Sequence, residues 1–181
     1  LGDDTISGGS GSNLLYGGDG ADILDYSTSS GSVNVNLGTN AVSGGDAAGD
    51  TVSGFEGVYG GSGNDTLTGD AGDNTISGGS GNDYITGGAG ADQIDGGSGN
   101  DTIDYSASGQ AVSVVLGGAV SGGDAQGDTL TSIEHVIGTS YDDALTGDDN
   151  ANQLTGGAGD DTLSGGAGAD SLYGGDGNDR L

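Results

Sequence analysis

Single aliphatic residues recur at every ninth position through much of the chain, each flanked by polar residues. The block from Gly60 to Asp104 reads GGSGNDTLT, GDAGDNTIS, GGSGNDYIT, GGAGADQID and GGSGNDTID. The eighth position of this unit is Ile or Leu in all thirteen complete or partial copies: Ile6, Leu15, Leu24, Leu67, Ile76, Ile85, Ile94, Ile103, Leu145, Leu154, Leu163, Leu172 and Leu181. Side chains of a β-strand alternate between its faces, so the pattern predicts a three-residue strand with one inward residue per unit.

A glycine-rich turn precedes each of these strands. The first position is Gly in every unit that contains it, and the sixth is Asp in ten units and Asn in three. One aliphatic residue cannot form a core alone, but stacked units would align these residues between two facing sheets. Glycines let the backbone adopt positive φ in the connecting turns. The repeat therefore predicts an all-β solenoid.

Composition and charge exclude several classes of function. The chain has 28 acidic residues, one Arg, no Lys and no Cys, and its formal net charge is −27. Without cysteine there is no disulfide or thiolate metal site, and without lysine there is no P-loop. Nucleic acid and anionic lipid headgroups would be repelled. No apolar run is long enough to insert into a membrane.

The acidic residues themselves indicate a metal. Of the 28, 26 are Asp, and the sixth-position Asp residues would stack along the edges of the solenoid. Carboxylates packed so closely cannot all remain charged and unpaired. A hard divalent cation, bound by carboxylates and turn carbonyls, removes this repulsion, and the flexible coordination of calcium suits such turns.

The motif GGxGxDxUx, with U aliphatic, closely resembles the RTX or haemolysin-type calcium-binding nonapeptide repeat. The resemblance implies a right-handed parallel β-roll with one coil per two units and several Ca²⁺ ions between turns eighteen residues apart. It also implies a bacterial protein that a type I secretion system exports unfolded and that folds in extracellular calcium. A secreted or cell-surface location is therefore expected.

The expected metal ligands are the sixth-position carboxylates and the carbonyls of turn glycines. The carboxylates belong to Asp4, Asp22, Asp65, Asp83, Asp92, Asp101, Asp143, Asp161, Asp170 and Asp179. The glycines are Gly61, Gly63, Gly79, Gly81, Gly88, Gly90, Gly97, Gly99, Gly157, Gly159, Gly166 and Gly168. Asn offers only a neutral oxygen, so the edges that carry Asp throughout should bind the tighter ions.

Two segments, 26–59 and 105–137, depart from the nonapeptide and resemble each other. The alternation of Val33, Val35 and Leu37, repeated in the second segment, predicts that each supplies a longer strand. We interpret both segments as coils that extend the same roll with a surface bulge, so that 1–181 is a single module. The remaining nonapeptide blocks are 1–25, 60–104 and 138–181.

Catalysis is not expected from this chain. His135 is the only histidine and has no clustered base beside it. Calcium would hold the Asp carboxylates ionised, which opposes the raised pKa that a general acid needs. Both ends fall inside a unit, at Leu1 and Leu181. We therefore expect a piece of a longer protein, whose parent is a secreted enzyme such as a protease, lipase or alginate epimerase, or an adhesin.

The alternative function is binding of an extracellular glycan or surface. Tyr16, Tyr84 and Tyr173 occupy outward seventh or ninth positions, where exposed rings could stack on sugars, but they are scattered along the chain. With a net charge of −27, a polyanionic polysaccharide would bind only through bridging calcium. Ice binding is not favoured, because the third position mixes Ser, Asp and Ala instead of forming a row of one residue type.

Overall fold

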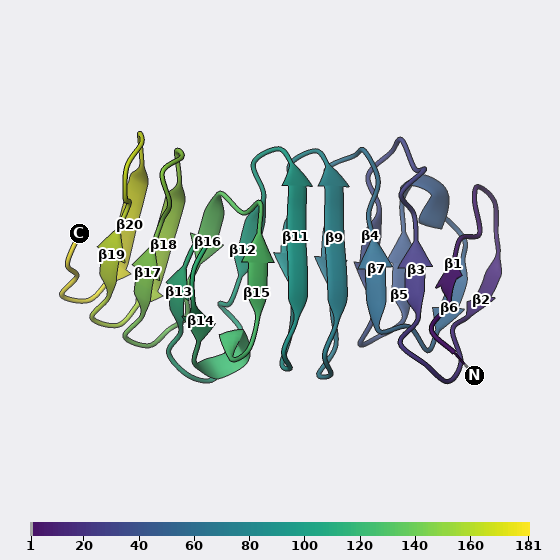
Figure 1. Cartoon of the computed structure of the whole chain (residues 1–181), viewed down its shortest axis with the longest axis horizontal. Helices are drawn as coiled ribbons and strands as arrows, with labels where there is room; N and C mark the ends of the chain where they lie inside the picture. Colours follow the sequence, from purple (N-terminus) through teal and green to yellow (C-terminus); the bar gives the residue numbers. More distant parts are fainter. Residues whose placement is uncertain (1) are drawn as a thin grey trace.

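The computed structural model describes residues 2–181, which form a right-handed parallel β-roll (Figure 1). The chain runs up the front face of Figure 1, crosses the upper edge, descends the back face and returns along the lower edge. A 6-stranded and a 4-stranded sheet form the front face, and an 8-stranded and a 2-stranded sheet form the back face. The all-β solenoid expected from the repeat is confirmed.

The order of strands within each sheet follows the coil. The front face contains β1 (Thr5–Ile6), β3 (Ile23–Asp25), β7 (Gly57–Tyr59), β9 (Thr75–Ser80), β11 (Gln93–Ser98) and β15 (Thr129–Thr131), then β14 (Val120–Ser121), β13 (Ser113–Val115), β17 (Ala144–Thr146) and β19 (Thr162–Ser164). The back face contains β2 (Leu14–Tyr16) and β6 (Thr51–Ser53), then β5 (Ala41–Ser43), β4 (Asn34–Asn36), β8 (Thr66–Thr68), β10 (Tyr84–Thr86), β12 (Thr102–Asp104), β16 (His135–Ile137), β18 (Gln153–Ala158) and β20 (Ser171–Asp176).

Strand pairing confirms one coil per two units. Ile76 of β9 pairs with Ile94 of β11, and Leu67 of β8 pairs with Ile85 of β10, both in parallel register. Four strands, β9, β11, β18 and β20, are six residues long rather than the expected three. Their pairing continues into the turns, where Gly79 lies opposite Gly97, because successive turns have the same backbone path.

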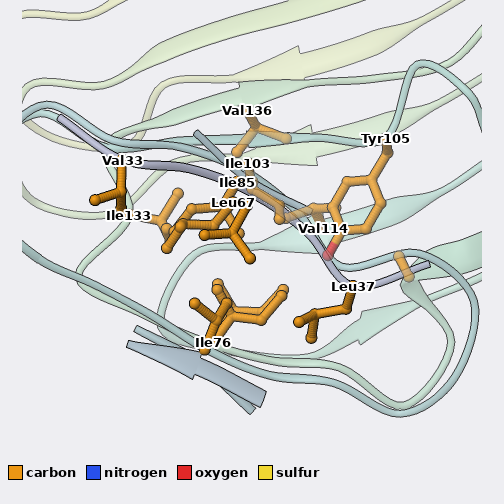
Figure 2. Close-up of a cluster of buried hydrophobic side chains, with 14 of the residues drawn as sticks. Val33, Leu37, Leu67, Ile76, Ile85, Ile103, Tyr105, Val114, Ile133 and Val136 are labelled. Carbon is orange, nitrogen blue, oxygen red and sulfur yellow. The ribbon is translucent and has the colours of Figure 1, made fainter. Parts of the chain in front are cut away.

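The core is a ladder of aliphatic residues between the two faces. Figure 2 shows Leu67, Ile85, Ile103 and Val136, from neighbouring strands of the back face, with Ile76 of the front face on the other side. All five side chains are at most 1% exposed. The eighth-position residues therefore point inward as predicted, except at the end of the roll, where Leu181 is 66% exposed.

The two departing segments, called insert 1 (26–59) and insert 2 (105–137), each contain an antiparallel hairpin followed by a short 3₁₀ helix. In insert 1, β4 pairs with β5 and η1 (Gly45–Ala47) follows. In insert 2, β13 pairs with β14 and η2 (Gly123–Ala125) follows. The β4–β5 hairpin lies in the back face and β13–β14 in the front face, with η1 and η2 at opposite edges (Figure 1).

The longer strand predicted in each insert is wrong. Val33, Val35 and Leu37 are buried as their alternation indicated, but β4 covers only Asn34–Asn36. The backbone N–H of Val33 donates to the carboxylate of Asp65 (2.8 Å) instead of to a strand carbonyl, so the ladder stops there. No helix in residues 2–181 is long and apolar enough to cross a membrane.

Candidate calcium sites in the turns

The structure buries most of the predicted carboxylates where a turn meets its strand. Seven of the ten are buried: Asp22, Asp65, Asp83, Asp92, Asp101, Asp143 and Asp161. Asp170 and Asp179, in the last coil, are partly exposed, and Asp4, in the first coil, is exposed. Burial therefore increases away from the two ends of the roll, where a turn has neighbours on both sides.

The sixth-position carboxylates form a ladder along each edge. The N–H of Asp65 donates to Oδ1 of Asp83, and the N–H of Asp83 donates to Oδ1 of Asp101, each at 2.8 Å and eighteen residues apart. On the lower edge the N–H of Asp143 donates to Oδ1 of Asp161 (2.8 Å). One oxygen of each carboxylate thus fixes the register of the preceding coil.

The second oxygen has no such partner at the centre of the ladders. Five Oδ2 atoms are buried without a hydrogen-bond partner in the described part of the chain, those of Asp22, Asp83, Asp92, Asp101 and Asp161. Burial raises the pKa of Asp83 to about 6, and the charges of Asp65 and Asp101 add to this effect, against the hydrogen bond from the N–H of Asp65. The pKa of Asp92 also rises to about 6, again chiefly through burial. A buried, unpaired carboxylate oxygen of this kind calls for a cation or a proton.

Glycine at the first position makes room for these carboxylates. A Cβ on Gly78 would collide with Oδ2 of Asp83 and with the carbonyl oxygen of Gly96 in the next coil. The carbonyls and carboxylates therefore approach each other closely at each turn. Oxygen donors of both kinds, without sulfur or nitrogen, fit a hard cation such as calcium.

The predicted glycines belong to two conformational groups. Gly79 and Gly81, with φ of 101° and 124°, adopt the left-handed region that side chains disfavour. The same region is occupied by Gly88, Gly90, Gly97, Gly99, Gly157, Gly159, Gly166 and Gly168. Gly61 and Gly63 do not adopt it, and a Cβ on either would collide with Ser29 or Ser32 of insert 1. The glycine carbonyls remain predicted ligands.

Two predicted ligands differ from the rest because their own turns satisfy them. Oδ2 of Asp65 accepts the N–H of Gly61 (2.6 Å), and Oδ2 of Asp143 accepts the N–H of Thr139 (2.5 Å). Their Oδ1 atoms accept the N–H groups of Val33 and Val112, both in inserts. These two Asp residues begin their ladders and need no cation to be fully hydrogen-bonded.

Four acidic residues of the inserts also occupy ladder positions, although they lie outside the nonapeptide blocks. Glu56 accepts the N–H of Asp22 (2.9 Å), and Glu134 accepts the N–H of Asp101 (2.8 Å). Asp50 and Asp128 accept backbone N–H groups in the same way. The available signal was that the only two Glu residues of the chain occupy equivalent places in the two inserts.

A second ladder on the exposed side of the turns was also missed. Oδ1 of Asn64 accepts the N–H of Asn82 (2.9 Å), and Oδ1 of Asn82 accepts the N–H of Asn100 (3.0 Å). These fifth-position bonds run in the direction opposite to the sixth-position ladder, so each coil is tied to both neighbours. The column of Asn and Asp at the fifth position was the available signal.

The remaining candidates, His135 and the three exposed tyrosines, lie on four different strands. His135 is half-buried on β16, with Nδ1 3.5 Å from the hydroxyl of Thr102. Tyr16, Tyr84 and Tyr173 are exposed as predicted and lie on three separate strands, β2, β10 and β20. Within residues 2–181, no three His, Asp or Glu side chains converge to hold a metal by themselves. Any calcium site would therefore need further oxygen donors, such as the turn carbonyls.

Comparison with known families agrees with this geometry. The model of the RTX calcium-binding nonapeptide repeat (4 copies) matches residues 1–28, 59–93, 68–103, 128–163 and 146–181. The matches cover more than half of the chain, and one of them begins at Asp128 inside insert 2. No curated protein gives a significant match. The stacked turns, the Asp ladders and the matched residues together show that the chain belongs to the RTX calcium-binding nonapeptide repeat family.

Proposed function

We propose that this chain is a non-catalytic module that binds several Ca²⁺ ions in its turns and folds when it binds them. The observation that carries the proposal is the set of five buried Oδ2 atoms without a hydrogen-bond partner in residues 2–181. In a chain with a net charge of −27, burying these carboxylates in their ionised form without a cation is strongly unfavourable.

The residues that would hold the ions are the sixth-position Asp residues and the glycine carbonyls of the same and adjacent turns. When bound, calcium supplies the positive charge that the buried oxygens lack. The Oδ1 atoms keep their backbone hydrogen bonds, so the carboxylates are already oriented, as between Asp65 and Asp83. Asp83 and Asp101 on the upper edge and Asp161 on the lower edge are the strongest candidates, since their Oδ2 atoms lie within uninterrupted ladders.

A calcium titration tests this function directly. In excess chelator, charge repulsion and chain entropy should leave most of the chain without β structure, and circular dichroism should show it appearing at about 10⁻⁴–10⁻³ M calcium. Magnesium should substitute poorly, because it requires a tight octahedral shell and releases water reluctantly. A complete β spectrum in chelator, unchanged by calcium, would refute the proposal.

Calcium-dependent folding also supports the secreted location expected from the family. A chain that stays extended at the low calcium of a cytosol can pass through a narrow export channel and then fold outside. The module would in this way assist both secretion and stability of its parent protein. Fusing it to a reporter and measuring export by a type I system, with and without the Asp ladders, tests this role.

Glycan binding is a second candidate, favoured by one observation. A groove of about 340 Å³ on the front face is lined by hydroxyl and amide side chains, one aromatic ring, the carboxylate of Asp95 and two Ile residues. Its lining includes Tyr59, Thr75, Ser77, Gln93 and Thr129. An aromatic ring beside several hydroxyl and amide groups suits a neutral saccharide.

The position of this groove makes Tyr59, and not the three exposed tyrosines named from the sequence, the candidate for stacking on a sugar. Tyr16, Tyr84 and Tyr173 do not line it, so Tyr59→Ala should abolish binding to a neutral glycan array while the triple Ser variant of the other three retains it. Loss of binding in the triple variant alone would instead assign recognition to the back face, where all three lie.

A further inference from the structure

In each insert, one Asp carboxylate has both of its oxygens hydrogen-bonded by the protein itself. Oδ1 of Asp50 accepts the N–H of Asn13 (2.8 Å), and its Oδ2 accepts the hydroxyl of Tyr26 (3.0 Å). In insert 2, Oδ1 of Asp128 accepts the N–H of Asp92 (2.9 Å), and its Oδ2 accepts the hydroxyl of Tyr105 (2.8 Å). A tyrosine hydroxyl thus donates to the Oδ2 atom of each insert Asp, whereas five Oδ2 atoms in the nonapeptide turns have no donor.

Tyr26 and Tyr105 stay protonated and can therefore donate these hydrogen bonds at any ordinary pH. Tyr26 is 1% exposed and Tyr105 is 3% exposed. Burial and the adjacent carboxylates raise the pKa of both phenols far above the ordinary value of 10.0, so each keeps its proton. A hydrogen bond from a protonated donor to a buried carboxylate is among the stronger ones in proteins. The inserts therefore satisfy their buried charge without a metal.

The inserts also carry a large apolar core and little charge. Insert 1 has three acidic residues, Asp46, Asp50 and Glu56, whereas the block 60–104 has eight. The buried apolar residues of insert 1 are Tyr26, Val33, Val35, Leu37, Ala47, Val52, Phe55 and Val58. Those of insert 2 are Tyr105, Val112, Val114, Leu116, Ala125, Ile133 and Val136. Each insert also contains a hairpin, whose contacts are local and close early.

We infer that the two inserts are folding nuclei that order at lower calcium than the nonapeptide blocks and template them. All five unpartnered Oδ2 atoms belong to nonapeptide turns, and none belongs to an insert. Ordered inserts present β4 and β13 as pairing edges to β8 and β17, from which the adjacent coils extend. The inference rests on the calcium-dependent folding proposed above and adds its order and its starting points.

We expect the two inserts to become ordered at different calcium concentrations. Insert 1 stacks on Asn13, whose amide donates to Oδ1 of Asp50 (3.1 Å) and to the carbonyl of Gly9 (3.2 Å). Insert 2 stacks on Asp92, whose Oδ2 is buried and unpartnered. Through its Glu, each insert also borders a turn whose Asp has an unpartnered Oδ2, Asp22 beside Glu56 and Asp101 beside Glu134. Insert 1 therefore borders one such carboxylate and insert 2 borders two, so insert 1 should order first.

Hydrogen exchange of the full chain, followed by mass spectrometry through a calcium titration, tests the inference. Peptides covering 33–37 and 51–58 should gain protection at the lowest calcium, those of insert 2 next, and those covering β9 and β11 last. Gain of protection by all peptides at one calcium midpoint would overturn the inference while leaving calcium-dependent folding intact. Full protection in chelator would overturn both.

Matched tyrosine variants supply the second arm. Tyr26→Phe removes only the hydroxyl that satisfies Asp50, so it should lower the protection of insert 1 at low calcium by roughly tenfold or more and leave insert 2 unchanged. Tyr105→Phe should do the reverse. Tyr16→Phe, at a side chain 57% exposed, is the control and should change neither. If neither buried tyrosine affects its own insert more than Tyr16→Phe does, the inference is wrong.

Discussion

At the scale of single residues, Asp83 illustrates how one carboxylate serves two purposes. Its Oδ1 accepts the N–H of Asp65, and its Oδ2 is buried without a partner. Asp83→Asn keeps an oxygen for Asp65 but removes the charge. We expect the calcium midpoint of folding to rise by about tenfold, since calcium affinity grows with ligand charge. The same change should favour the metal-free fold, because a buried charge disappears.

The control for this prediction is Asp95→Asn. Asp95 lies on β11 with its side chain exposed, and its substitution changes the net charge by the same amount. Circular dichroism during calcium titration should give a midpoint close to that of the unmodified chain. Equal shifts for the two variants would mean that total charge, rather than the ladder, sets calcium affinity.

The same burial should make the metal-free roll more stable at acidic pH than at neutral pH. The pKa of Asp83 and of Asp92 is about 6 in the fold, against an ordinary value of 3.8, so the fold binds more protons than the unfolded chain between these values. Their contribution to metal-free stability is therefore complete below pH 3.8 and is lost as the pH rises through 6. In chelator, acidification from about pH 7 to about pH 5 should increase β ellipticity. A decrease over this range would contradict the pKa shifts.

At the scale of elements, Gly78 of β9 lies so close to the turn atoms of its own and the next coil that a side chain there should destabilise the fold. Gly78→Ala places a Cβ against Oδ2 of Asp83 and the carbonyl of Gly96. We expect a loss of about 1–3 kcal/mol in the free energy of unfolding at saturating calcium, measured with urea. Gly109→Ala is the control, because a Cβ at that residue would have nothing within 4 Å and its φ is not positive. Equal losses would show that packing at the turn is loose.

Elements within the nonapeptide blocks could be predicted from the sequence because each unit contacts copies of itself. Ile76 and Ile94 pair because they occupy the same position in units eighteen residues apart. In the inserts that spacing fails, since the N–H of Asp22 reaches Glu56, 34 residues away. The ladder role of Glu56 and the Tyr26–Asp50 hydrogen bond depend on how the hairpin folds back. No column of residues in the repeat encodes that path.

At the scale of the whole molecule, the number of nonapeptides between the inserts determines which face each hairpin joins. Five units separate Tyr59 from Tyr105, and each unit crosses from one face to the other. Deleting one unit, 78–86, should bring both hairpins to the same face, whereas deleting two, 78–95, should keep them on opposite faces. Both variants should still fold in calcium, because the remaining units stay in register.

Spin labels at Thr39→Cys and Ala119→Cys would measure this outcome. Both positions are exposed near the hairpin tips, and the chain has no other cysteine. The two-unit deletion should shorten the label distance only along the roll, by about one strand spacing of 4.8 Å. The one-unit deletion should also remove the separation across the roll. Identical distances in the two variants would contradict the alternation of faces.

The opposite placement of the hairpins has a consequence for how such a molecule can change. Insert 1 and insert 2 are related by a half rotation about the roll axis together with a shift along it, as in a twofold screw. Gain or loss of a single nonapeptide rotates everything downstream by half a turn, while gain or loss of a pair only slides it. A replication slip of 27 bases in the coding sequence, three for each of nine residues, would thus redirect a binding face without altering any residue within it.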